Sequence, residues 1–283
     1  MKDIIYDPAT KFDFKCADYV PFKDRELCEK LRLMSGTELE KREAWHHPEF
    51  NIKVMMNPHP VLIATLFSRI KAASEAGKKY TMILGNPEPD TYIPLAQLIN
   101  YFQVDCRNLH IFAMDEWADQ DGNVAPLTYG AGLGYSFINH FYARIREDLR
   151  PPLKQMHYYT NENFPYYSDL IDETGDGGAD LIISATGWIG HTAFIDPATK
   201  KFKADTLEEF CQLGSRIVTE TPLTICENSL FSPMGASGDV WAVPYKAATI
   251  GPRDIVGAKE RVELHNFVNA DGSSWQRMVS RLE

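Results

Sequence analysis

The feature that most constrains the fold is an alternation of short apolar runs with segments of helical period. Apolar runs at 80–85, 108–114 and 180–186 are each followed by glycine or polar residues, and their lengths are those of buried strands. Segments with helical periodicity, such as 92–102 and 135–149, separate these runs. Strands that alternate with helices predict an α/β fold with a mostly parallel sheet covered on both faces.

Weaker patterns extend this assignment to both ends of the chain. We expect further helices at 24–33, 37–44, 61–76 and 273–282, and further strands at 216–221, 247–251 and 261–268. The first 55 residues or so lack a regular alternation. We therefore expect residues 1–55 to form a helical extension that packs on a single α/β domain of residues 56–283.

Composition excludes several classes of protein. Among 283 residues, 44% are hydrophobic and 24% charged, as in ordinary soluble proteins. The longest largely apolar run, 61–67, is far shorter than the ~20 residues of a membrane helix, and the N-terminus lacks the apolar stretch of a signal peptide. The net charge of −10, without a basic run longer than two residues, argues against a nucleic-acid partner.

The cysteines indicate a reducing compartment. There are five, an odd number, widely spaced and without a Cys-x-x-Cys pair. This pattern fits neither a disulfide framework nor a zinc site. We therefore expect a cytoplasmic protein.

Three of the predicted strands are followed by residues that can bind a ligand or take part in catalysis. These strand ends are 86–91, 115–117 and 187–196. In parallel sheets, ligands bind beyond the carboxyl ends of the strands. We expect the three segments to meet in one crevice.

Asp115 and Glu116 directly follow an apolar strand. A partly desolvated carboxylate at this position has a raised pKa and can move a proton between neighbouring carbon atoms. The alternative is a solvated turn or a cap for the next helix, and the residues alone do not decide between the two.

His191 lies in a glycine-containing segment after another strand. Gly187 and Gly190 allow the backbone to approach a ligand closely, and a histidine can act as acid or base near neutral pH. Asp196, five residues later, can orient or charge-pair the imidazole. The alternative is a buried, hydrogen-bonded histidine beside a turn, and two candidate acid/base strand ends in one chain favour a site.

These motifs resemble those of a known family. Residues 114–117, Met-Asp-Glu-Trp, resemble the Met-Asp-Glu-Tyr strand end of glucosamine-6-phosphate deaminases, which are also called isomerases. Residues 187–197 are similar to their Gly-x-Asp-Gly-His-x-Ala-Phe-Asn-Glu-Pro segment. Residues 135–137 and 219–231 follow in family order, so the resemblance spans about 80–251. Thr192 is closer to the related 6-phosphogluconolactonases, whereas Phe194 and Pro197 are closer to the deaminases.

The resemblance implies a Rossmann-like three-layer sandwich, a sugar or sugar-phosphate substrate, and no metal or redox cofactor. It implies that His191 assists ring opening, that Asp115 moves a proton between C2 and C1, and that Asp196 orients the histidine. It also implies a substrate-binding role for Asn86, Thr91, Glu116, Gly187, Gly190 and Arg216. A homo-oligomer is left open.

The chain departs from the family pattern mainly where the family binds phosphate. Its phosphate loop, Thr-Gly-Gly-Thr, is replaced by residues 88–91, Glu-Pro-Asp-Thr. A proline removes a backbone donor, and two carboxylates repel an anion. The family's phosphate arginine and lysine correspond to Leu230 and Trp275, and the aspartate before Gly-His to Ile189.

These departures leave three hypotheses. The first is a deaminase-like isomerase with altered phosphate recognition. The second is a 6-phosphogluconolactonase-like hydrolase, and the third a sugar-binding or regulatory protein on an impaired enzyme scaffold. Two other motifs are interpreted as structural. Glycines 130, 132 and 134 are interpreted as a loop before a helix rather than a dinucleotide-binding loop. His46, His47 and His59 are interpreted as surface or packing residues rather than metal ligands.

Overall fold

The computed structural model describes residues 13–41, 47–85, 88–197, 199–231, 234, 237–267 and 274–282. The helices and strands follow one another in the order α1 (Arg25–Leu33), α2 (Gly36–Glu40), α3 (His59–Glu75), β1 (Tyr80–Leu84), α4 (Pro89–Tyr101), β2 (Leu109–Ala113), β3 (Asp115–Ala118), α5 (Leu133–His140), β4 (Met156–His157), α6 (Tyr167–Gly175), β5 (Leu181–Ser184), α7 (Leu207–Phe210), β6 (Arg216–Thr219), α8 (Pro222–Asn228), β7 (Lys246–Thr249), α9 (Pro252–Gly257), β8 (Glu260–Glu263) and α10 (Val279–Leu282).

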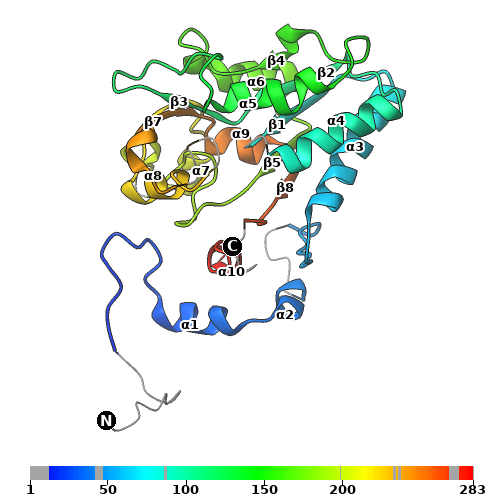
Figure 1. Cartoon of the computed structure of the whole chain (residues 1–283). Coiled ribbons are helices and arrows are strands. Elements are labelled where there is room, and N and C mark those ends of the chain that lie inside the picture. The colour runs from blue at the N-terminus through cyan, green and yellow to red at the C-terminus, as the bar shows by residue number, and fades with distance from the viewer. Residues whose placement is uncertain are drawn as a thin grey trace.

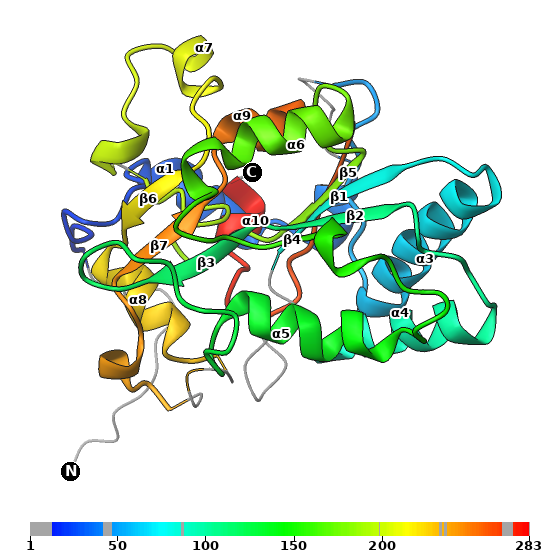
Figure 2. The same cartoon turned by 90° about the horizontal axis from the view of Figure 1, so that it is seen from above.

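The central sheet is entirely parallel, with strand order β4-β2-β1-β5-β8. Its side chains alternate between two apolar clusters. Met82 and Ile111 face helices α3, α4 and α5, whereas Ile83, Phe112 and Ile182 face α6 and α9. Figure 2 shows these two groups of helices on opposite sides of the strands. The predicted three-layer α/β sandwich is confirmed.

A second, antiparallel sheet of order β3-β7-β6 stands beside the first. The segments predicted at 216–221 and 247–251 belong to this sheet as β6 and β7, not to the parallel one. Met114 connects the two sheets: its N–H donates to Leu84 of β1, and its carbonyl accepts from Ile250 beyond β7. Asp115, expected in a strand end or turn, is therefore the first residue of β3.

One predicted helix is shorter than expected. The segment 135–149 forms α5 only as far as His140, followed by a 3₁₀ turn at Tyr142–Arg144. Phe141 interrupts it with φ −124° and ψ −71°, outside the helical region. Its side chain is fully buried against the ring of Tyr92, with centroids 5.7 Å apart. Burial of this ring decides the backbone there, which periodicity does not reveal.

Helices α1 and α2 lie below the sheets in Figure 1, beside α10. Two arginines near the C-terminal helix hold this segment: Arg277 donates to the carbonyl of Arg32 at 3.3 Å, and Arg281 to that of Met34 at 3.1 Å. The boundary near residue 55 remains a prediction. Within the described ranges, no helix combines the length and apolarity needed to cross a membrane.

Candidate active site

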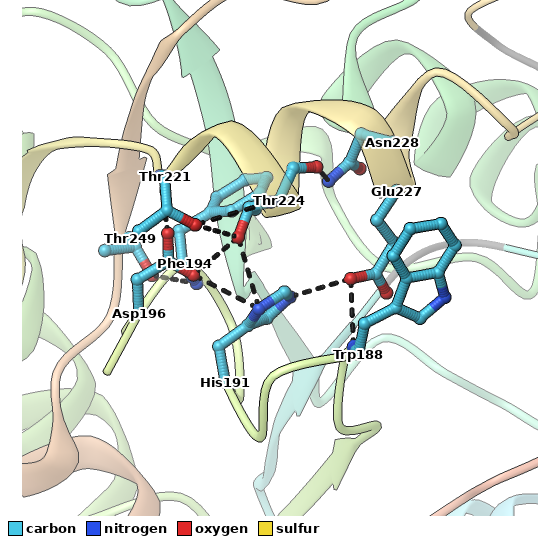
Figure 3. Close-up of polar contacts among 9 residues, drawn as sticks. All are labelled: Trp188, His191, Phe194, Asp196, Thr221, Thr224, Glu227, Asn228 and Thr249. Atoms are coloured by element: carbon cyan, nitrogen blue, oxygen red, sulfur yellow. Dashed lines mark hydrogen bonds and ion pairs between the residues drawn. The ribbon is translucent and has the colours of Figure 1, made fainter. Parts of the chain in front are cut away.

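The candidate site lies where the loop after β5 meets helix α8 (Figure 3), beside strand β7, which pairs with the start of β3. A tight loop returns His191 to the end of β5. Gly187 accepts from Gly190 at 3.0 Å and donates to the carbonyl of His191 at 2.8 Å. Gly190 has φ +83°, in the left-handed region that glycine adopts readily. The two glycines thus shape the loop, and the role predicted for them in substrate binding stays a prediction.

His191 lies between two carboxylates, as Figure 3 shows. Its Nδ1 is 3.1 Å from Oδ1 of Asp196, and its Nε2 is 3.9 Å from Oε2 of Glu227. Burial alone would lower the pKa of the imidazole, but the hydrogen bond with Asp196 and the negative charges of Glu227 and Asp196 raise it. The arrangement favours an imidazolium that can give a proton to an oxygen atom.

Asp196 is itself fixed by the start of α8. Its Oδ2 accepts from the backbone N–H of Thr221 and its Oδ1 from the hydroxyl of Thr224, both at 2.7 Å. Burial raises the pKa of this carboxyl, yet the bonds with His191, Thr224 and Thr221 bring it below its usual value. Asp196 is therefore suited to orient the imidazole as an anion.

Glu227 comes from the last turn of α8 and also holds the loop. Its Oε2 accepts from the backbone N–H of Trp188 at 3.0 Å. Gly187 packs so closely that a Cβ there would clash with Cε1 and Nε2 of His191 and lie 2.9 Å from Oε2 of Glu227. The imidazole is therefore confined on its Nε2 side.

Asp115 is buried at the junction of the two sheets. Burial and, to a smaller extent, the negative charge of Glu116 raise the pKa of its carboxyl to about 7, while His191 acts in the opposite direction. A carboxyl group with this pKa exchanges a proton readily at neutral pH. Asp115 and His191 influence each other's pKa, and their joint role in catalysis stays a prediction.

Glu116 has a different environment from its neighbour. Its carboxylate accepts from the backbone N–H groups of Trp117, Leu133 and Gly134 at 2.8–3.0 Å. Two of these donors belong to the first turn of α5, where backbone N–H groups have no partner within the helix. Glu116 anchors that helix, as the capping alternative described, and its predicted substrate-binding role stays a prediction.

The other predicted substrate-binding residues are not all in one place. Thr91 lies at the start of α4, and its Oγ1 is 2.9 Å from Nδ1 of His59. Arg216 donates to the carbonyls of Gly214 at 2.9 Å and Lys201 at 2.5 Å, and its guanidinium lies over the ring of Phe202. Asn86 lies outside the described residues.

Two carboxyl groups were missed by the sequence analysis, Glu220 and Glu227. Glu220 follows β6, as Asp115 follows β2, so its position after a strand could have marked it as a candidate site residue. Both of its oxygen atoms are buried without a hydrogen-bond partner. Burial first, and then the charges of Asp196 and Asp115, raise its pKa well above the usual value. Glu227 lies within α8, where spacing gives no such signal.

Comparisons with known proteins identify relatives of the chain. No protein-family model matches it. A glucosamine-6-phosphate deaminase of Fusobacterium nucleatum is 29% identical over 201 residues, which are 69% of this chain and 65% of that relative. The chain thus spans less than two thirds of that relative's length. A second, from Phocaeicola vulgatus, is 28% identical over 206 residues, 71% of each protein.

Solved structures show the same fold. A monomeric glucosamine-6-phosphate deaminase, described as a missing link of the NagB superfamily, aligns with a TM-score of 0.55 and 20% identity over 82% of this chain and 92% of that one. A 6-phosphogluconolactonase from Trypanosoma cruzi aligns with a TM-score of 0.51 and 14% identity over 83% and 92%.

Proposed function

We propose that the chain is an isomerase of amino sugars that releases ammonia. The proposal starts from its similarity to glucosamine-6-phosphate deaminases, in sequence and in fold. The observation that carries the proposal is Asp115, a buried carboxyl group with a pKa of about 7. The proposal is also supported by the imidazole of His191, which Asp196 holds at 3.1 Å. We expect the reaction to take place in the cytoplasm.

The proposed reaction starts with ring opening, in which His191 transfers a proton at the ring oxygen. Asp115 then removes the proton from C2 of the open-chain 2-amino aldehyde, and the electron pair moves into an enolamine. Return of that proton to C1 gives a 2-imino compound, which water hydrolyses to a ketose and ammonia. Asp196 is the positioning residue, because it holds the imidazole from Nδ1.

Glu227 supplies a carboxylate on the Nε2 side of the imidazole. The resemblance assigns an acidic residue to position 189, where this chain has a buried isoleucine. Glu227 approaches Nε2 of His191 from α8 instead. We include it in the proposed acid/base machinery, since a second negative charge favours the protonated imidazole.

The test is a screen of amino sugars, their 6-phosphates and sugar lactones, read by release of ammonia, ketose and acid. Removing the base, Asp115→Asn, should reduce turnover by about 10²-fold or more, the usual scale for a general base. Asp176→Asn is the matched control, because Asp176 is exposed and pairs with Lys79 at 3.2 Å.

Three outcomes contradict the proposal. Release of acid from lactones without ammonia favours the hydrolase. Binding without turnover favours the sugar-binding protein. Equal turnover by Asp115→Asn and the parent shows that the assigned base is wrong.

A further inference from the structure

A mostly apolar cleft with a few polar side chains lies at the carboxyl edge of the central sheet, near the candidate site. It is formed by residues after β1, β5 and β8 together with the start of α4 and a side chain of α3; its lining consists of Leu62, Gly85, Glu88, Thr91, Tyr92, Ile183, Ser184, Ala185, Leu264, Asn266 and Phe267. Ala185 is two residues before Gly187, against which His191 packs.

Four side chains form a chain of hydrogen bonds along one wall. Asn266 Nδ2 is 2.9 Å from Nε2 of His59 and donates to Oε2 of Glu88 at 3.1 Å, and His59 Nδ1 contacts the hydroxyl of Thr91. Reversing the Asn266 amide would place its oxygen against the Glu88 carboxylate, so the bonding network fixes its orientation. His59 Nε2 then accepts, and its Nδ1 donates to Thr91.

This network leaves an acceptor without a donor. Asn266 Oδ1 is buried and has no hydrogen-bond partner. One oxygen of Glu88 accepts from Asn266, and the carboxylate has acceptor capacity to spare. A buried acceptor without a donor is costly, and a ligand that donates a hydrogen bond would satisfy it.

Positive charge is missing from the described lining of the cleft, which includes neither lysine nor arginine. Burial raises the pKa of Glu88, and the titratable groups that act on it are His59 and the exposed Asp90. At neutral pH a phosphate ester offers mostly acceptor oxygens and a negative charge. The negative charge would be repelled by the carboxylate of Glu88, and the acceptor oxygens cannot donate a hydrogen bond to Asn266 Oδ1.

Aromatic rings border the cleft. Phe267, one of the lining residues, stacks on Trp275 with centroids 4.8 Å apart and an interplanar angle of 8°. Trp188 meets the other side of Trp275 edge-on, with centroids 5.8 Å apart, and Trp188 lies beside Glu227 in Figure 3. Apolar ring surface therefore connects the cleft with the candidate site.

We propose that the cleft formed by Glu88, Thr91, Ser184 and Asn266 binds the hydroxyl-bearing end of an unphosphorylated sugar and discriminates against a phosphate there. The inference rests on the proposed function, because it places the reacting carbon atoms at Asp115 and His191. It names the substrate class as neutral or amino sugars without a phosphate group.

Calorimetry with the full chain tests this proposal with two probes, D-glucosamine and glucosamine 6-phosphate. We expect D-glucosamine to bind at least tenfold more tightly. Glu88→Gln removes the charge but keeps an oxygen that can accept from Asn266. It should improve binding of the phosphorylated probe by about tenfold and change that of D-glucosamine by less than threefold.

Two further variants keep the test decisive. Asp90→Asn alters an exposed side chain, so it provides a test even if Glu88→Gln fails to fold. It should also improve binding of glucosamine 6-phosphate, by a smaller factor. Glu147→Gln, whose side chain is 91% exposed and pairs with Arg150 at 3.7 Å, is the control for loss of one negative charge and should change neither affinity.

Equal or tighter binding of glucosamine 6-phosphate by the parent protein overturns the inference, as does failure of both probes to bind. An unchanged preference in both Glu88→Gln and Asp90→Asn also overturns it. Binding of D-glucosamine without release of ammonia leaves the inference standing and counts against the proposed function. The two failures are therefore distinguishable.

Discussion

At the scale of single residues, the cost of burying Asp115 predicts how stability depends on pH. A carboxyl with a pKa of about 7 in the folded protein and 3.8 as its ordinary value binds its proton more tightly when folded. Its contribution to stability is therefore present below about pH 4 and is lost as the pH rises to about 7. The difference corresponds to roughly 4 kcal/mol at most.

Asp115→Asn should consequently stabilise the protein at pH 8 and have little effect at pH 4. Urea unfolding at the two pH values measures this difference. Asp176→Asn, on the surface, should show no such dependence. Equal effects of Asp115→Asn at both pH values would mean that the carboxyl titrates normally.

The position of Gly187 predicts a second effect at this scale. A methyl group there would overlap the imidazole of His191 and crowd Glu227. Gly187→Ala should displace the ring, lower turnover by about 10²-fold, the scale for a general acid or base, and cost roughly 1–3 kcal/mol of stability. Gly130→Ala is the control, because a Cβ at Gly130 meets nothing within 4 Å. Normal turnover in Gly187→Ala would remove His191 from the mechanism.

At the scale of elements, Glu116 links β3 to the start of α5 through three backbone N–H groups. Glu116→Ala leaves these donors buried and unpaired, and each such group costs about 1–3 kcal/mol. We expect a loss of at least about 3 kcal/mol in the free energy of unfolding, with a smaller loss for Glu116→Gln, which retains an acceptor oxygen. Chemical denaturation measures both, and Glu147→Ala on the surface is the control. Equal stability of Glu116→Ala and the parent would contradict the anchoring role.

The sequence predicted the central sheet better than the second one. The strands β1, β2 and β5 are short apolar runs with clear ends, so their pattern and their common edge were readable. Strand β3 was not, because its buried residues include Asp115 and Glu116, which resemble a turn. The same limit applies to the site: Asp115 and His191 follow strands in sequence, whereas Glu227 reaches His191 only because α8 packs across the loop.

At the scale of the whole molecule, the contacts of the N-terminal segment lead to a prediction about domain organisation. Its α1 contacts α10, and the arginine side chains of Arg277 and Arg281 bond to its last carbonyls and the following residue. A shortened protein of residues 56–283 should therefore fold. Its free energy of unfolding should fall by roughly 1–2 kcal/mol, because α10 loses its contacts with α1. Denaturation and circular dichroism measure this, and loss of the cooperative transition would show that residues 1–55 are part of the domain.

Thr249 connects the strand of the proposed base to the loop of the proposed acid. In β7 it stands opposite Asp115, and its hydroxyl accepts from the backbone N–H of Phe194, two residues before Asp196. One side chain thus ties the antiparallel sheet to the loop that follows the parallel one. The strand that pairs with Asp115 is thereby joined to the loop of His191 and Asp196 by a single hydrogen bond. A shift of β7 would therefore be passed to that loop through the Thr249 hydroxyl.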